Sequence, residues 1–397
     1  MPVRRPTHRL ATALACSFAL AVGGHAAAAA DPEAIRAIVD EAVRPVMTQH
    51  GLPGMAVAVT VDGQAMFFNY GLASKEPARP VNEHTLFELG SISKTFTATL
   101  AGYAQAQGKL SFDDHPGQYV PALKGSALDR ATLLELGAYT AAGLPLQVPE
   151  TVQDDVQMLA WLRGWQPSAA PGTQRRYSNP SIGLFGRIAA VALGRDYADA
   201  LERELFPALG LRHSHVRVPA AAMPDYAWGY DQAGKPLRSG PGVFDAETYG
   251  VKASSADLIR FVQANIDPGQ LPAPLRRAVE ATHVGYYQVG PMVQGLGWEQ
   301  YRGPLSLQRL VEGNGPDMAF EPHPATRLAP APAPAGTLFN KTGSTRGFGA
   351  YAAFIPERRI GIVMLANKVY PNAARVTAAH AILTHIAAQT APRAAAR

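Results

Sequence analysis

The stretch GSISKTF, Gly90–Phe96, places two serines and one lysine at the start of an apolar segment with helical periodicity. Residues three apart on a helix share a face, so the side chains of Ser91 and Lys94 can meet. Ser93 and Lys94 point about 100° apart on a turn of 3.6 residues. The positive end of the helix dipole also favours negative charge developing on a serine oxygen in the first turn. The spacing therefore selects Ser91 over Ser93 as a nucleophile that could give its proton to a nearby base.

By itself this S-x-x-K pattern also fits a capping serine followed by a solvated lysine. A second motif, KTGS at Lys341–Ser344, lies at the end of the predicted strand TLFN. There, Lys341 and Thr342 present a cation and a hydroxyl that can hold a substrate carboxylate. Gly343 allows the backbone to approach a ligand closely, and the N–H of Ser344 can point at a scissile carbonyl.

The third motif is Tyr177-Ser178-Asn179, in the stretch RRYSNPS ahead of a predicted helix. A phenol beside one or two lysines has a lowered pKa and can act as a base. An asparagine amide offers both a donor and an acceptor to a substrate amide. These motifs, in this chain order on a helix, a loop and a strand, indicate a serine acyl-transfer site.

Hydrophobic patterns at the two ends of the chain predict one sheet. Asp31-Pro32 begins a predicted helix that Gly51 ends, and Asp62-Gly63 predicts a hairpin. TLFNKTGS, GAYAAFI and RIGIVMLANK predict three consecutive strands, followed by a final helix in NAARVTAAHAILTHIAAQ. We predict an α/β fold of the α+β type, in which helices from both chain ends flank an antiparallel sheet. Residues 31–90 and 220–397 form the α/β region, residues 91–219 form an inserted, mainly helical region, and the active site lies between the two.

The first thirty residues have the features of a signal peptide. Arg4, Arg5 and Arg9 form a basic segment, and Leu10–Val22 is an apolar run too short to span a bilayer as a stable anchor. Small residues allow cleavage after Ala28, Ala29 or Ala30. We therefore expect export to the periplasm, without a membrane anchor after signal cleavage.

Composition excludes several classes of protein. The chain has 397 residues, of which 47% are hydrophobic and 17% charged, so it can bury a large core. Three of its 36 basic residues lie in the signal segment, which leaves 33 against 31 acidic residues. No Lys/Arg stripe supports nucleic-acid binding. Cys16, the single cysteine, lies in the apolar run of the signal, so the mature chain has no disulfide and no cysteine-based metal site.

The sequence resembles the class C (AmpC-type) serine β-lactamases over nearly all of its mature length. Tyr-Ser-Asn in place of Ser-Asp-Asn favours class C over class A. The resemblance implies the fold shared by β-lactamases and penicillin-binding transpeptidases. The matching stretches are YGLASKEPARPVNEHTLFELGSISKTFTATLAGYA, GLPLQVP, PGTQRRYSNPSIGLFG, FPALGL, FDAETYGVK, QGLGWE, NKTGSTRGFGAYAAFIPE and GIVMLANKVYPNAARV.

The resemblance also implies catalytic roles. Ser91 resembles the nucleophile that is acylated. Lys94 and Tyr177 resemble the groups that accept its proton and later activate the deacylating water, and which of them is the general base stays open. The backbone N–H groups of Ser91 and Ser344 would form the oxyanion hole. Lys341 resembles the lysine that supports Tyr177 and the substrate carboxylate.

A substrate-binding set follows from the same resemblance. Gln147 and Asn179 resemble amides that hold the side-chain carbonyl of a β-lactam, and Tyr249 resembles the aromatic wall of the side-chain pocket. Asn372 and Arg375 resemble a second contact region for the substrate carboxylate. The full set is Gln147, Asn179, Tyr249, Thr342, Gly343, Asn372 and Arg375.

Some positions depart from the commonest family pattern. Ala142 stands where glycine is usual, Arg346 where Gly or Asn is common, and Val369 where Asn is frequent. The pair His213-x-His215 forms half of a zinc signature, but an arginine follows where that signature has an aspartate, so we assign the pair no catalytic role. We expect no metal and no organic cofactor.

The expected reaction is the hydrolysis of cephalosporins and penicillins through an acyl-enzyme on Ser91. The alternative is a D-alanyl-D-alanine carboxypeptidase or an esterase of the same fold, and a non-catalytic sensor is a further rival. From the resemblance we expect a monomer whose partner is a small-molecule β-lactam substrate. The substrate spectrum and the response to inhibitors are not predicted.

Overall fold

The computed structural model describes residues 1–3, 31–141 and 143–390 of the protein. Most of the predicted signal peptide, its cleavage positions and Ala142 therefore lie outside the described residues. In the part of the chain that is described, no helix is long and apolar enough to cross a membrane.

A ten-stranded antiparallel sheet forms the centre of the α/β region, in the order β14-β10-β11-β12-β15-β16-β17-β1-β2-β3. The first strand of the chain, β1, pairs with the last, β17. The sheet is therefore assembled from both ends of the chain, as the sequence predicts. The strands are β1 (Gly54–Val61), β2 (Gln64–Lys75), β3 (Ala78–Pro80), β10 (Tyr287–Val289), β11 (Met292–Gln294), β12 (Glu299–Tyr301), β14 (Thr326–Arg327), β15 (Leu338–Ser344), β16 (Gly349–Ile355) and β17 (Ile360–Ala366).

Local sequence explains the central strands. Asp62 and Gly63 both have positive φ angles, 47° and 84°, so they make the tight turn that pairs Val61 with Gln64. Every residue of β1, β16 and β17 is buried. Burial on both faces explains why these strands are continuously apolar rather than alternating.

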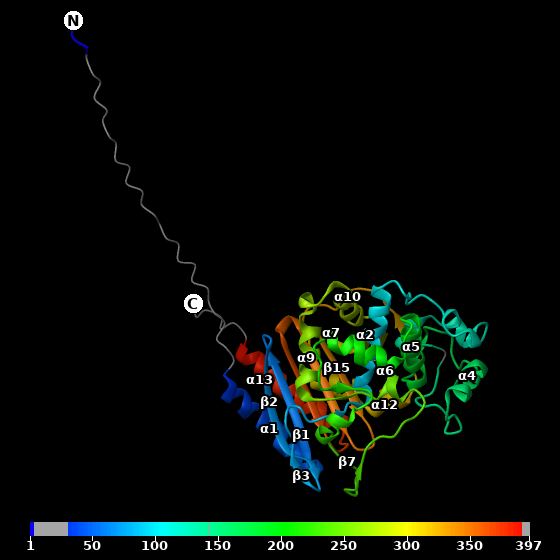
Figure 1. Ribbon diagram of the computed structural model, residues 1–397, viewed down its shortest axis with the longest axis horizontal. Coiled ribbons are helices and arrows are strands. Elements are labelled where there is room, and N and C mark those ends of the chain that lie inside the picture. The colour runs from blue at the N-terminus through cyan, green and yellow to red at the C-terminus, as the bar shows by residue number, and fades with distance from the viewer. Residues whose placement is uncertain (4–30, 142, 391–397) are drawn as a thin grey trace.

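Helices cover both faces of the sheet (Figure 1). The helices α1 (Pro32–His50) and α13 (Asn372–Thr390) pack together on one face, while α9 (Ser255–Ile266) packs on β1 and β17 from the other. Asp31 caps α1 by accepting a hydrogen bond from the N–H of Glu33, and Gly51 ends it with φ 56°. Both terminal helices were predicted, whereas α9 was not.

The helical layer is built around α2 (Ser93–Ala106), which packs against α5 (Asn179–Ala192) and α10 (Ala273–Thr282). Because α10 and α8 (Asp245–Thr248) follow residue 219, this layer also draws on later parts of the chain. The limits of 91–219 for a helical region remain a prediction. The other helices are α3 (Leu133–Gly137), α4 (Asp155–Gly164), α6 (Tyr197–Ala200), α7 (Phe206–Ala208), α11 (Leu307–Gly313) and α12 (Pro316–Phe320).

Short strand pairs tie the two regions together. Strand β5 (Gln174–Arg175) pairs with β13 (His323–Pro324), and β9 (Lys252–Ala253) pairs with both β4 (Phe87–Glu88) and β6 (Ser214–His215). A small hairpin joins β7 (Gly229–Tyr230) to β8 (Pro236–Leu237). These pairs form small sheets separate from the main one.

Candidate active site

The nucleophile segment lies directly against the end of β15. Ser91 sits in a short 3₁₀ turn, η1 (Gly90–Ile92), which leads into α2. A Cβ on Gly90, whose φ is 52°, would lie 2.4 Å from the amide nitrogen of Ser344. A Cβ on Gly343 would lie 2.0 Å from the carbonyl oxygen of Leu89. Gly343 therefore lets β15 touch the nucleophile segment, and it also lines the pocket, so its predicted closeness to a ligand stays a prediction.

The two serines of the opening motif have different partners. The Nζ of Lys94 donates to the Oγ of Ser91 at 3.0 Å and to the carbonyl oxygen of Thr248 at 2.8 Å. The Oγ of Ser93 instead accepts from the N–H of Val251 at 3.0 Å. Lys94 is completely buried, and this desolvation lowers its pKa to about 8. The structure thus pairs Ser91, and not Ser93, with the lysine.

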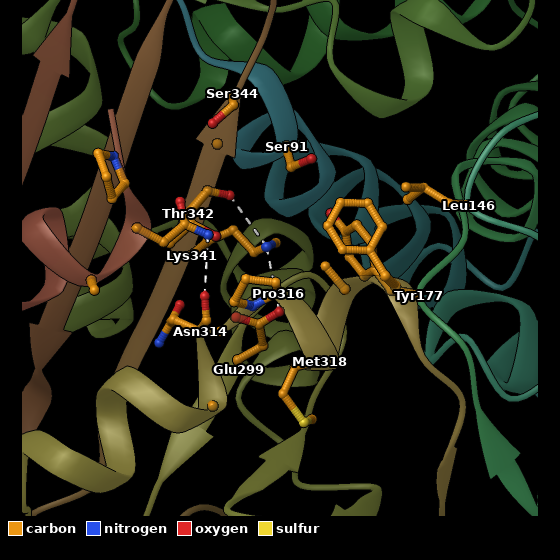
Figure 2. A pocket seen from close by; sticks show the side chains of 18 of the residues that line it. Ser91, Leu146, Tyr177, Glu299, Asn314, Pro316, Met318, Lys341, Thr342 and Ser344 are labelled. Atoms are coloured by element: carbon orange, nitrogen blue, oxygen red, sulfur yellow. Dashed lines mark hydrogen bonds and ion pairs between the residues drawn. The ribbon is translucent and has the colours of Figure 1, made fainter. Parts of the chain in front are cut away.

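Tyr177, two residues before α5, lies near two ammonium groups, and Figure 2 shows it in the pocket together with Lys341. The Nζ atoms of Lys94 and Lys341 lie 5.2 and 5.1 Å from the centroid of its ring. Burial would raise the pKa of the phenol, but the charges of Lys341 and Lys94 outweigh it and lower that pKa below its ordinary value. Among the described residues, the buried hydroxyl has no hydrogen-bond partner of ordinary geometry. This hydroxyl is placed to receive a proton.

A buried carboxylate that the sequence motifs do not reveal completes the cluster. The Oε1 of Glu299 lies 3.3 Å from the Nζ of Lys341 and 3.7 Å from the Nη2 of Arg175. Burial would lower the pKa of Lys341, but the negative charge of Glu299 outweighs it and raises that pKa. Arg175, two residues before Tyr177, is only 1% exposed, and its guanidinium lies 5.5 Å from the tyrosine ring centroid. The motif lysine and tyrosine thus belong to a larger charged network.

A pocket of about 540 Å³ opens above these groups, within the usual range for small-molecule sites. The Nδ2 of Asn179 donates to the Oε1 of Gln147 at 2.9 Å, which brings the two predicted amides together. The buried Oδ1 of Asn179 has no partner in the described part of the chain. Tyr249, Thr342 and Asn372 line the same pocket as the nucleophile.

Arg375 does not lie where the family pattern suggests. Its side chain is fully buried and does not line the pocket. One nitrogen, Nη1, donates to the carbonyl oxygens of Gly343 at 2.6 Å and Ala350 at 3.2 Å, and Nη2 donates to that of Tyr370 at 2.5 Å. Because the guanidinium is buried and donates to backbone oxygens of both strands, Arg375 braces β15 against β16. In this geometry it makes no direct contact with a bound carboxylate.

The remaining sequence features lie at the rim or away from it. Arg346 is exposed in the turn between β15 and β16. The carbonyl oxygen of Val369 accepts a hydrogen bond from the Nε2 of Gln232 at 3.2 Å. His213 stacks on His84 with ring centroids 4.6 Å apart. Within the described ranges, no group of three or more His, Cys, Asp or Glu side chains could hold a metal ion.

Comparison with known proteins agrees with this geometry. The sequence model of the family described as Beta-lactamase matches residues 39–386. A β-lactamase of Pseudomonas fluorescens is 54% identical over 351 residues, which cover 88% of this chain and 98% of the relative. The crystal structure of a class C β-lactamase in complex with cefoxitin has a TM-score of 0.86 and 48% identity, and the match covers 90% of this chain and all of that one. A structure from Pseudomonas syringae, named a β-lactamase/D-alanine carboxypeptidase, has a TM-score of 0.87 and 48% identity, covering 89% of this chain and 99% of that one.

The chain belongs to the β-lactamase family. Within that family it is a class C serine enzyme of the AmpC type, a hydrolase that acts on β-lactams.

Proposed function

We propose that this hydrolysis proceeds through an acyl-enzyme on Ser91. The observation that carries the proposal is the 3.0 Å contact between the Oγ of Ser91 and the buried ammonium of Lys94, beside a tyrosine whose pKa is lowered. The Oγ attacks the lactam carbonyl, the carbonyl–nitrogen bond breaks, and the ring nitrogen takes up a proton. Water then hydrolyses the ester and restores the hydroxyl. The N–H groups of Ser91 and Ser344 stabilise the oxyanion in both steps.

Tyr177 is the proton acceptor in this proposal, and Lys94 is its cationic partner. Lys94 already donates to two oxygens, whereas the Tyr177 hydroxyl has no such partner among the described residues. Since the pKa of Lys94 is about 8, this lysine is mostly protonated at neutral pH.

Acylation rates measured against pH distinguish the two candidate bases. If Lys94 acts as a cation, the rate falls as the pH rises through about 8; if neutral Lys94 is the base, the rate rises through the same pH. Tyr177→Phe should lower kcat by roughly 10²- to 10⁴-fold, the usual contribution of a general base. Full hydrolysis by Ser91→Ala would disprove the whole scheme.

The substrate is held from both sides of the nucleophile. Lys341 and Thr342 bind the carboxylate of the β-lactam, with Asn372 at the second contact region. Asn179 and Gln147 hold the amide of the acyl side chain, where the substrate carbonyl replaces the Gln147 oxygen that Asn179 now contacts at 2.9 Å. The ring of Tyr249 forms the wall against which the acyl side chain packs.

A second activity, that of a D-alanyl-D-alanine carboxypeptidase, is the alternative for the same site. It is favoured by the similar structure from Pseudomonas syringae, whose name includes both activities. Turnover of a chromogenic cephalosporin should exceed the release of D-alanine from a D-alanyl-D-alanine peptide by orders of magnitude. A stable acyl-enzyme that does not turn over would favour the carboxypeptidase instead.

The mature protein acts in the periplasm as a monomer in this proposal. The basic and apolar segments of the first thirty residues support export. Cell fractionation and N-terminal sequencing of the mature chain, which should begin directly after Ala28, Ala29 or Ala30, test this location. Light scattering of the purified protein tests the monomer.

A further inference from the structure

A buried carboxylate that catalysis does not use lies three residues before the nucleophile. Glu88, on β4, is only 2% exposed. Its Oε1 accepts hydrogen bonds from the Oη of Tyr226 at 2.6 Å and from the N–H of Ser239 at 2.8 Å, and its Oε2 accepts from the Oγ of Ser239 at 2.6 Å. All three donors belong to one long segment, residues 216–250, which we call the wall loop. Glu88 therefore connects the nucleophile segment to two separate points of this loop.

The first of these points is also held by the backbone. Leu86 donates to the carbonyl oxygen of Asp225 at 2.9 Å, and Ala227 donates to that of Leu86 at 3.0 Å. Arg238, next to Ser239, lies over the ring of Tyr226 and so ties the loop to itself rather than to β4. Arg238 also donates to the carbonyl oxygens of Tyr226 and Ala227, so among the described residues the direct hydrogen bonds from Ser239 to β4 are those to the Glu88 carboxylate.

Ser239 is linked to the pocket through Gly242. A Cβ on Gly242 would lie 3.3 Å from the Oη of Tyr249, so the tyrosine hydroxyl lies directly over this part of the loop. Tyr249 lines the substrate pocket on one side and a second cavity of about 650 Å³ on the other. Glu88 and Ser239 line that second cavity. The ring therefore has space behind it, and the loop segment that Ser239 fixes limits how far the ring can move back.

The catalytic end of the wall loop is held separately. Lys94 donates to the carbonyl oxygen of Thr248, and the N–H of Val251 donates to Ser93. The hydroxyl of Thr248 donates to the carbonyl oxygen of Phe244 at 2.6 Å. A change at Ser239 can thus move the pocket wall without moving the groups around the nucleophile.

We propose that Glu88 is a positioning residue that sets the aromatic wall and thereby the preference of the enzyme for the acyl side chain of its substrate. The inference rests on the proposed role of Tyr249 as that wall. It predicts an effect that depends on whether the substrate has an acyl side chain, which a general loss of stability would not produce.

Two penicillins test the proposal: benzylpenicillin, which has an aromatic acyl side chain, and 6-aminopenicillanic acid, which has none. Glu88→Ala removes both acceptors that hold Ser239, so it should raise KM for benzylpenicillin roughly three- to tenfold, no more than the loss of about one methylene contact costs. Ser239→Ala keeps the N–H bond to the Oε1 of Glu88, so it should raise the same KM by a smaller factor. KM for 6-aminopenicillanic acid and kcat for both compounds should stay within about twofold of the parent enzyme, because the groups around the nucleophile do not move.

Matched controls separate positioning from folding. Tyr226→Phe removes one hydrogen bond to the same carboxylate. Backbone hydrogen bonds to Leu86 still hold the loop at this point, so this variant should leave both KM values unchanged. Glu88→Gln keeps the shape and the Oε1 acceptor, and should restore most of the benzylpenicillin KM. If Glu88→Ala does not fold, the smaller rise in the benzylpenicillin KM expected of Ser239→Ala still tests the proposal.

The outcomes identify which proposal fails. If Tyr249→Leu leaves the KM ratio of the two penicillins unchanged, the wall role of Tyr249 is wrong and the inference about Glu88 fails with it. If Tyr249→Leu changes the ratio but neither Glu88→Ala nor Ser239→Ala does, the inference alone is overturned. Equal KM changes for both penicillins, or an equal effect of Tyr226→Phe, would also overturn it.

Discussion

Replacing Glu299 by glutamine tests whether its buried carboxylate balances the charges of the catalytic cluster. The carboxylate lies 3.3 Å from the Nζ of Lys341 and 3.7 Å from the Nη2 of Arg175. With an effective dielectric constant of about 20, these distances correspond to attractions of about 5 and 4.5 kcal/mol. Desolvation offsets much of this attraction, and removing one partner of a buried ion pair typically costs about 3–5 kcal/mol. We expect Glu299→Gln to lower the free energy of unfolding by about this amount.

The same change should alter the pH dependence of catalysis. Glu299 is the strongest influence raising the pKa of Lys341 and one of those raising the pKa of Tyr177, so both pKa values should fall in the variant. A base with a lower pKa becomes active at lower pH, so the acidic limb of kcat/KM should move to lower pH. The maximum of kcat/KM should fall roughly 100-fold or less, the size expected from a misplacement of about 1 Å in the cluster.

Thermal unfolding and a pH profile of kcat/KM provide the measurements. A loss of 3–5 kcal/mol corresponds to a fall in Tm of roughly 6–10 °C at about 2 °C per kcal/mol. Glu280→Gln is the matched control, because it makes the same substitution in an exposed pair whose Arg276 nitrogen lies 3.9 Å away. Such pairs contribute about 0–1 kcal/mol, so the control should melt within about 2 °C of the parent protein. The reasoning is refuted if the two variants melt alike and the acidic limb does not move.

Three further changes test the surroundings of the nucleophile. Gly343→Ala places a Cβ 2.0 Å from the carbonyl oxygen of Leu89, just ahead of the nucleophile, so it should lower the free energy of unfolding by about 1–3 kcal/mol and remove most of kcat. Gly164→Ala is the control: its Cβ would have no atom within 4 Å, so both the free energy of unfolding and kcat should stay unchanged. Ser93→Ala leaves the buried N–H of Val251 without its acceptor and should cost about 1–3 kcal/mol in denaturant unfolding, yet acylation should persist, because Ser93 is not the nucleophile. Arg346→Gly removes an exposed positive charge near the pocket mouth and should change the ratio of kcat/KM between a penicillin and a cephalosporin by roughly two- to fivefold; an unchanged ratio would exclude a role for this charge in substrate preference.

The central half of the sheet could be predicted because its signals are local. The hairpin at Asp62-Gly63 needs two residues that tolerate positive φ, and the long apolar strands carry their own pattern. The strands at one end of the sheet, β14, β10, β11 and β12, have only two or three residues each, too few to show a period, and the pairing of β14 and β12 depends on distant segments. Helix α9 could have been found, since Ser254 caps it by accepting from the N–H of Asp257 ahead of apolar residues in helical spacing.

The site shows a similar division. Ser91, Lys94 and Tyr177 lie in motifs whose order along the chain already suggests their chemistry. Glu299 was missed because its proximity to Lys341 arises from the pairing of β12 with β15, which places Glu299 opposite the residue before that lysine. No spacing along the sequence encodes that register.

The contact predicted for Arg375 failed for another reason. A motif gives the identity of a residue at a position, but it does not say whether the side chain faces a cavity or the core. Here the guanidinium is fully buried and donates to three backbone oxygens. The guanidinium instead braces β15, the strand that carries the lysine of the KTG motif.

The charge balance of the cluster explains why neither lysine acts alone. Lys94, Lys341 and Arg175 surround Tyr177 with three potential cations, and Glu299 supplies one nearby carboxylate. In the free enzyme, the excess of positive charge lowers the pKa of the Tyr177 phenol. The phenol therefore loses its proton more readily, as a general base requires. When the carboxylate of a substrate joins Lys341, that excess decreases, and the phenol then holds a proton more readily. In the proposed mechanism, the same side chain accepts a proton from Ser91 and later returns it to the leaving nitrogen, as a general base that becomes a general acid must do.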